Sequence, residues 1–302
     1  MNAQRFNGLD TRRMMAAAAT VASVLTLGVT AADAAPKSGA GSSDPSAPYS
    51  DAMKTITGVL RDFRAMNTAN GHPDFGGVPS AGAGHSVGNV GEFLDTGGDP
   101  VYVGGGMMLA TEFRDSEGRA IHPSLFNASL GDTAGTFGAP SDGGVTSGST
   151  FNDWYNDVPG MNTSGPFQID FHWDSGSDSW VYDETLASNQ AVIGGGGNSN
   201  FEYSYELNLQ FVYNLNAGQF LEIGGMDDCF VFVNGQLVVD LGGVNHAERQ
   251  YVPMDRLGLT DGQVYEMKIL MTERIKQRED VRIAMNFEFW DGELPTTMAM
   301  FD

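Results

Sequence analysis

The sequence is poor in cysteine, in basic residues and in long apolar stretches, and each shortage narrows what the protein can be. Its single cysteine, Cys229, excludes an intrachain disulfide, so the fold must hold by core packing, with or without a metal. Only 16 of 302 residues are lysine or arginine, against 38 aspartates and glutamates, which gives a formal net charge of −22. A surface of this sign repels nucleic acid and anionic lipid, so neither is an expected partner.

The one long apolar run, residues 14–30, lies near the start of the chain and is typical of an export signal. Three arginines precede it, and Ala32-Asp33-Ala34 supplies the small residues that a signal peptidase cleaves after. Two of the arginines stand in Thr11-Arg12-Arg13, so the signal is of the Sec type or of the twin-arginine type. We expect cleavage near Ala34 and a secreted or cell-surface protein without a membrane span, the alternative being an uncleaved anchor.

The mature chain divides by composition into a linker, one domain and a tail. Removing residues 1–34 takes away three arginines and two aspartates and leaves a net charge of −23 (13 basic residues less 36 acidic). Residues 35–50 are rich in Pro, Ser and Gly and predict a flexible linker. We expect one domain over residues 51–290 and a loose tail over 291–302.

Alternation of apolar and polar residues predicts β-strands at the start and in the second half of this domain, whereas residues 67–148 are Gly-rich and are expected to be mainly loops. A short helix is expected only near Phe151–Tyr155. The turn between two apolar runs, Asn234-Gly235, favours a type I′ hairpin. The sequence therefore predicts an all-β, antiparallel sandwich or barrel with long Gly-rich loops. The predicted strands cover residues 55–63, 201–211, 219–223, 230–240, 264–271 and 281–289.

The stretch Gly225-Met-Asp-Asp-Cys-Phe-Val-Phe-Val-Asn-Gly-Gln-Leu-Val-Val-Asp-Leu-Gly-Gly243 resembles the core signature of the fibro-slime domain family. Further pieces follow in the family's order, among them Tyr251–Leu259, Thr272-Glu-Arg274 and, upstream, Phe151–Asn162. The resemblance implies a PA14-like β-sandwich of the kind found in secreted or surface proteins that bind carbohydrate or mediate adhesion.

The resemblance also implies a calcium ion held by Asp227 and Asp228 through a cis peptide bond, with sugar hydroxyls completing its oxygen shell. Neighbouring side chains on a trans strand point to opposite faces, so a cis bond would aim both carboxylates at one point. We expect Glu273, in a loop over residues 272–280, as a third ligand, with groups around Asn245 and His246 as the next candidates to complete the site. Arg274 is expected either to donate to sugar hydroxyls or to pair with Asp227. The family commonly has Asp where this chain has Met226, which weakens the assignment, and a solvated turn is the alternative.

Other candidate residues fit known sites less well. Trp173 and Trp180 lie among Asp, Ser and Gly and are candidates for stacking on sugar rings, whereas Trp154 is expected in the core. Gly84-His-Ser-Val-Gly88 matches a nucleophile elbow but lacks the flanking strand and helix. Asp95-Thr-Gly97 and Asp174-Ser-Gly176 match the paired motifs of aspartic proteases but are better explained as turns, and Asp240 as a turn cap.

Together these patterns predict a secreted, calcium-assisted carbohydrate-binding or adhesive module that binds an extracellular glycan and catalyses no reaction. Two alternatives remain open. One is a structural surface or matrix protein that makes protein contacts without a metal, and the other is a hydrolase whose active site the motifs do not identify.

Overall fold

The computed structural model describes residues 52–77, 84–183, 202–244, 248–275 and 281–290. The predicted signal, linker and tail (1–34, 35–50 and 291–302) lie outside the described residues, as do Asn245 and His246. Among the helices of the described ranges, none is long and apolar enough to cross a membrane.

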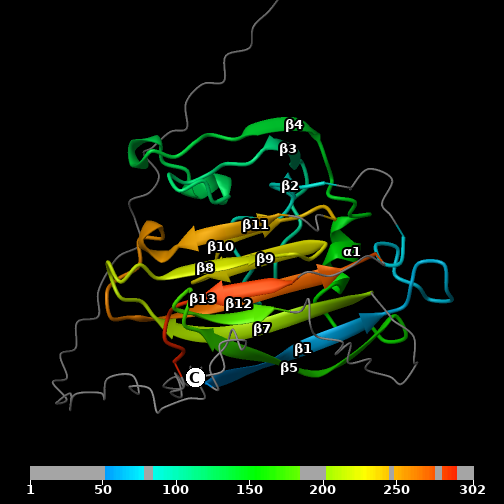
Figure 1. Cartoon of the computed structure of the whole chain (residues 1–302). Coiled ribbons are helices and arrows are strands. Elements are labelled where there is room, and N and C mark those ends of the chain that lie inside the picture. Colours follow the sequence, from blue (N-terminus) through cyan, green and yellow to red (C-terminus); the bar gives the residue numbers. More distant parts are fainter. Residues whose placement is uncertain (1–51, 78–83, 184–201, 245–247, 276–280, 291–302) are drawn as a thin grey trace, which may run out of the picture. The chain divides into compact units, whose positions relative to one another are not determined.

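The described residues form an antiparallel, sandwich-like β fold, which confirms the predicted class (Figure 1). Every paired strand in the large sheet runs antiparallel to its neighbours. In spatial order its strands are β10 (Gln236–Leu241), β9 (Asp228–Val233), β12 (Val264–Glu273), β7 (Tyr203–Val212), β1 (Met53–Phe63), β5 (Asn162–Asp174), β6 (Ser179–Asp183), β13 (Arg282–Met285), β8 (Phe220–Gly224) and β11 (Arg249–Pro253).

Strand alternation builds the core as the sequence predicts. In β7 the odd-numbered residues from Tyr203 to Phe211 are buried in the main core, while Asn208 and Gln210 point to the other face. The hairpin between β9 and β10 turns at Asn234 and Gly235, whose φ angles of 52° and 76° are the two positive values that a type I′ turn needs.

A second hydrophobic cluster covers part of the sheet's outer face. It contains Phe230 and Phe232 of β9, Leu270 of β12, and the fully buried Trp154, which confirms that this tryptophan is a core residue. The cover includes the predicted short helix, α1 (Gly148–Asp153), which begins at a capping box formed by Ser147 and Thr150.

Some elements differ from the sequence prediction. Residues 107–111 lie in a small three-stranded sheet within the Gly-rich half. Strand β5 was not predicted because Gly165 and Pro166 interrupt its alternation, and β6 was not predicted because it is short and follows the turn at Gly176. The small sheet and the short 3-10 helices are β2 (Ser86–Val87), β3 (Met107–Thr111), β4 (Thr136–Pro140), η1 (Pro123–Leu125), η2 (Ala128–Leu130) and η4 (Met254–Arg256).

Gly58 marks the point at which β1 separates from β7. The two strands pair from Val59 onward, whereas the first half of β1 pairs only with β5. A Cβ atom on Gly58 would lie 2.3 Å from the carbonyl oxygen of Glu206. Only glycine therefore allows the two backbones to approach this closely.

Replacing Gly58 by alanine should therefore destabilise the fold by about 1–3 kcal/mol, since backbone must move to admit the methyl group. Urea unfolding of the Gly58→Ala variant measures this. Gly138→Ala is the matched control, because a Cβ there on exposed strand β4 meets its nearest atom at an ordinary 3.6 Å. Equal stability of the two variants would contradict the assignment of a close crossing at Gly58.

Candidate functional site

The acidic pair that carries the calcium prediction is buried and divided between two faces of the sheet. Asp227 and Asp228 are 0% and 1% exposed. No peptide bond among the described residues is cis, so the predicted cis linkage is wrong. Beyond the pair, Cys229 faces the main core and Phe230 the second cluster, as alternation on a trans strand requires. The two carboxylates therefore point to different partners.

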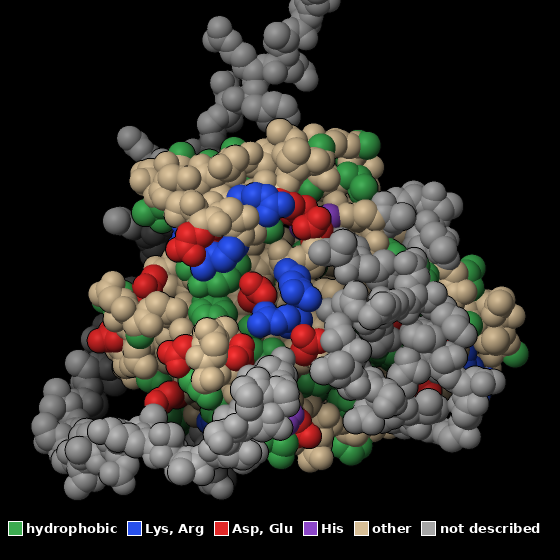
Figure 2. Space-filling view, viewed as in Figure 1, with side chains coloured by type: hydrophobic (Ala, Val, Ile, Leu, Met, Phe, Trp, Pro, Cys, Tyr) green, Lys and Arg blue, Asp and Glu red, His purple; other side chains and the backbone are tan. Residues whose placement is uncertain are grey.

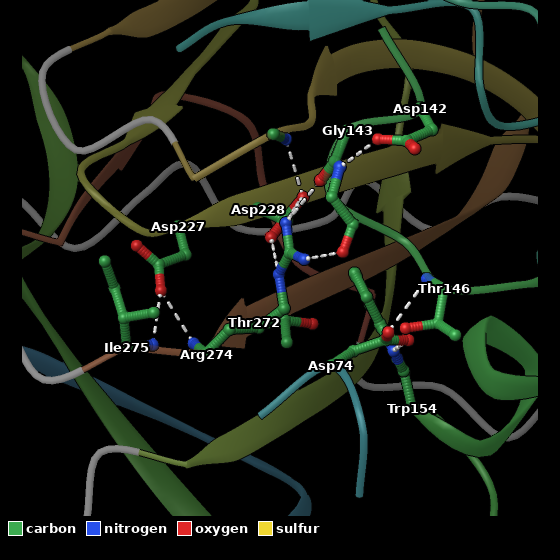
Figure 3. A network of polar contacts seen from close by, with 12 residues as sticks. Asp74, Asp142, Gly143, Thr146, Trp154, Asp227, Asp228, Thr272, Arg274 and Ile275 are labelled. Atoms are coloured by element: carbon green, nitrogen blue, oxygen red, sulfur yellow. Dashed lines mark hydrogen bonds and ion pairs between the residues drawn. The ribbon is translucent and has the colours of Figure 1, made fainter. Parts of the chain in front are cut away.

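Asp228 is paired with Arg274, which is 0% exposed (Figure 3). The guanidinium Nε donates to Asp228 Oδ2 at 2.7 Å, and Nη2 donates to Oδ1 at 3.1 Å. The backbone N–H of Gly243 donates to the same Oδ1 at 2.7 Å. Burial raises the pKa of Asp228 to about 6, although the charge of Arg274 and the Gly243 N–H act in the opposite direction.

Arg274 also joins the sheet to the segment that covers it. Its Nη2 donates to the carbonyl of Gly143 at 2.7 Å, and Nη1 donates to that of Gly144 at 3.0 Å. The guanidinium carbon lies 4.7 Å from the ring centroid of Trp154, a cation–π contact. The indole N–H of Trp154 in turn donates to Asp74 Oδ2 at 3.0 Å. The expected contact of Arg274 with a sugar is therefore wrong for this arrangement, since the side chain is enclosed.

Asp227 holds the end of β12 through its backbone. Its Oδ2 accepts from the N–H groups of Arg274 and Ile275 at 2.7 and 2.8 Å. Glu273 lies at the end of β12 rather than in a loop, and it is 0% exposed. Met226, at the position of the family's additional Asp, is buried in the main core.

These residues do not fit the calcium site that the resemblance implies. Calcium takes six to eight oxygens, whereas Asp228 is engaged by a guanidinium and Asp227 Oδ2 by two backbone amides. Within the described ranges, no group of three or more His, Cys, Asp or Glu side chains is placed to hold a metal ion. The arrangement is instead a buried structural ion pair.

The other predicted residues separate into strand and turn positions. Trp173 and Trp180 lie directly opposite each other on β5 and β6, with ring centroids 5.2 Å apart, and their stacking on a sugar ring stays a prediction. Asp95 Oδ1 accepts from the N–H of Gly97, and Asp174 Oδ1 from that of Gly176, which confirms that both motifs form turns. Ser86 of the elbow motif is buried on the two-residue strand β2.

Breaking the central ion pair should cost about 3–5 kcal/mol of unfolding free energy, because Arg274→Ala leaves the Asp228 carboxylate buried without its cation. Arg274→Lys should recover little of this, since one ammonium cannot replace the guanidinium fork. Chemical denaturation gives both values.

The control is Arg282→Ala, which removes a partly exposed pair with Glu222 at 2.7 Å and should cost less than about 1 kcal/mol. A loss at Arg274 as small as that at Arg282 would show that the buried pair is not a main support of the fold.

A second buried polar cluster joins the small sheet to β10. His85 Nδ1 lies 2.8 Å from Glu112 Oε1, and its Nε2 lies 2.8 Å from the carbonyl oxygen of Asp240. Both ring nitrogens thus face acceptors, which favours the imidazolium form. Asp240, predicted as a turn cap, lies near the end of β10 and is buried; its Oδ2 accepts from the N–H of Gly88, and its carboxylate also interacts with the backbone N–H of Gly242 just after the strand.

The titration of His85 makes this junction sensitive to pH. Burial lowers the pKa of His85, but the hydrogen bond and charge of Glu112 outweigh it, so the pKa is raised above its ordinary value. Burial raises the pKa of Asp240 to about 6. In both groups the folded state favours the protonated form. The contribution of His85 to the free energy of unfolding is complete below about pH 6.5, the pKa of histidine in the unfolded chain. It is lost as the pH rises through the pKa of His85 in the folded state.

We therefore expect wild type to exceed His85→Gln in unfolding free energy by more at about pH 5.5 than at about pH 8.5. Denaturant titrations across this range measure the difference. His122→Gln serves as a control of opposite sign: burial lowers the pKa of His122 to about 4, so only the unfolded state gains its proton in this window, and wild type should exceed this variant by less at about pH 5.5 than at about pH 8.5. Parallel pH profiles for wild type and His85→Gln would contradict the charged junction.

An open, polar groove lies beside the covered part of the sheet's outer face, and no sequence motif indicated it. It has a volume of about 870 Å³ and crosses β1, β7 and β12. Its floor presents the side chains that point away from the main core. These are Thr55 and Thr57 of β1, Asn208 and Gln210 of β7, and Glu266 and Lys268 of β12.

The last described segment fills the gap between β1 and β7 and brings an aromatic side chain to the groove. Phe289 bridges Phe211 of β7, and the backbone N–H of Trp290 donates to the carbonyl of Gln210 at 2.8 Å. Trp290 lines the groove and is 43% exposed. Because Phe289 packs against the main core, its neighbour Trp290 faces outward.

The far wall of the groove is the loop containing Leu94 and Gly98. Lys268 Nζ donates to the carbonyl of Gly98 at 2.7 Å and lies 2.9 Å from Glu206 Oε1. Arg61 Nη1 contacts the other carboxylate oxygen of Glu206 at 3.1 Å. Although burial acts to raise it, these two cations hold the pKa of Glu206 below its ordinary value. Lys268, itself paired with Glu206, thus holds the loop at Gly98 against the sheet.

Comparison with known proteins gives distant relatives only. The chain is 27% identical to Protein psiR of Dictyostelium discoideum over 259 residues, which are 80% of this chain and 22% of that protein. It is 30% identical to Protein psiD of the same organism over 155 residues, 47% of this chain and 30% of that protein. The chain thus spans less than a third of the length of either relative. No family model and no solved structure matches it.

Proposed function

We propose that this chain is an extracellular carbohydrate-binding or adhesive module whose glycan site is the groove on the open half of the sheet, with no metal at Asp227 and Asp228. The observation that carries the proposal is the composition of the groove. It combines hydroxyl, amide and charged side chains with one exposed tryptophan in about 870 Å³, within the usual size of small-ligand sites.

The division of the outer face supports this assignment. Aromatic residues fill the half around Phe230 and Leu270, whereas threonines and amides line the open half. Figure 2 shows acidic and basic side chains interspersed over the described part of one face of the chain. The resemblance of residues 225–243 to fibro-slime domains, and the export signal expected over residues 1–34, favour the same class of function.

The test is retention of the purified chain on immobilised glycans and on extracellular matrix proteins, each in calcium and in a chelator. We expect glycan binding of equal strength in both buffers, because no step of the proposed contact involves a metal. Binding that disappears in chelator would restore the calcium prediction and overturn the metal-free site. Retention on proteins alone, or on nothing, would overturn carbohydrate binding itself.

A further inference from the structure

We propose that the groove selects neutral oligosaccharides, with Trp290 stacking on a pyranose ring and the side chains of β1, β7 and β12 binding its hydroxyls. This inference rests on the proposed function and adds the chemical class of the ligand and the residues that recognise it.

The polar groups on the groove floor match a polyhydroxylated ligand. Thr57 and Asn208 are exposed, and Gln210 is half-buried beside them. Hydroxyl and carboxamide side chains each donate and accept hydrogen bonds, as sugar hydroxyls do. Strands hold these side chains on one surface, so little side-chain order has to be gained on binding.

The charges of the groove disfavour acidic sugars. Two lysines line the groove. The charge of Lys268 is matched by Glu206, which also contacts Arg61, whereas Lys54 Nζ lies over the rings of Trp180 and Phe289. Glu266 is exposed on the floor, and Asp170 lies at its edge, where it accepts a hydrogen bond from Thr55 at 2.6 Å. A uronate or a sulfated sugar would meet these carboxylates on a chain of net charge −22. A neutral sugar avoids this repulsion.

Trp290 has the placement of an aromatic platform. Its backbone is fixed to β7 by the hydrogen bond to Gln210, and the neighbouring Phe289 is held in the core with Lys54 Nζ 5.0 Å from its ring. The indole is thus 43% exposed on a rigid support. An aromatic face in this position suits the C–H face of a pyranose. Trp173 and Trp180, by contrast, lie outside the groove and contact each other.

The experiment compares calorimetric titrations with a neutral glucan oligosaccharide and a polyuronate of the same length, at low and at high salt. We expect the neutral ligand to bind more tightly, with little dependence on salt. A preference for the polyuronate would overturn the inference while leaving carbohydrate binding intact. Absence of binding to both, and to the wider glycan set above, would instead defeat the proposed function.

Variants then locate the site. Trp290→Ala should weaken the affinity for the neutral ligand about tenfold or more, and Trp290→Phe should weaken it less. Asn208→Ala should weaken the same affinity several-fold. The matched control is Gln168→Ala. Gln168 lies opposite Thr57 in the pairing of β1 with β5, on the same face of the sheet but outside the groove. Thermal melts confirm that each variant is folded. Unchanged affinity in Trp290→Ala, or an equal loss in Gln168→Ala or Trp173→Ala, would overturn the assignment.

Discussion

The ion pair between Asp228 and Arg274 is the constraint on which the arrangement of the outer face depends. A charge pair in a protein interior is favourable only when its geometry and hydrogen bonds offset the cost of dehydration. Here the guanidinium satisfies both carboxylate oxygens, two backbone carbonyls and one aromatic face together. The pair thus ties β9 and the end of β12 to the segment around Gly143 and to Trp154, and so fixes which half of the sheet is covered.

That division gives one sheet two different surfaces. Under the cover, even-numbered residues of β9 and β12 such as Phe230 and Leu270 are apolar and buried. Farther along β12, on the same face, Lys268 and Glu266 are polar and line the groove. The change along one strand separates a face that stabilises the domain from a face that remains accessible to a ligand.

Much of the fold followed from the sequence, because alternation reports directly which side of a strand is buried. The strands around Phe211, Phe230 and Met267 and the Asn234-Gly235 turn were predicted on that basis. Strands β5 and β6 were not, since Gly165 and Pro166 break the pattern and the turn near Gly176 resembles a loop.

The site was harder to predict, because it depends on the tertiary arrangement. The family resemblance implied that Asp227 and Asp228 share a calcium ion, but whether Asp228 faces a cation or an arginine depends on how Arg274 enters the same layer. The groove is assembled from β1, β7, β12 and Trp290, segments far apart in the chain, each of which contributes only one or two ordinary polar residues. No local motif marks such a surface. The polar positions of the alternating strands were its only signal in the sequence.

The insertion of residues 288–290 into the gap left by β1 has a consequence for assembly. The groove brings together the first described strand, β1, and the last described segment. Contacts between segments so far apart in the sequence form slowly, because a long loop must close. A chain with its central strands folded but this segment undocked would have a stable core and an incomplete floor. The groove is therefore complete only when both ends of the described chain have docked, and an assay of the proposed glycan binding would distinguish fully folded molecules from compact ones in which this segment is undocked.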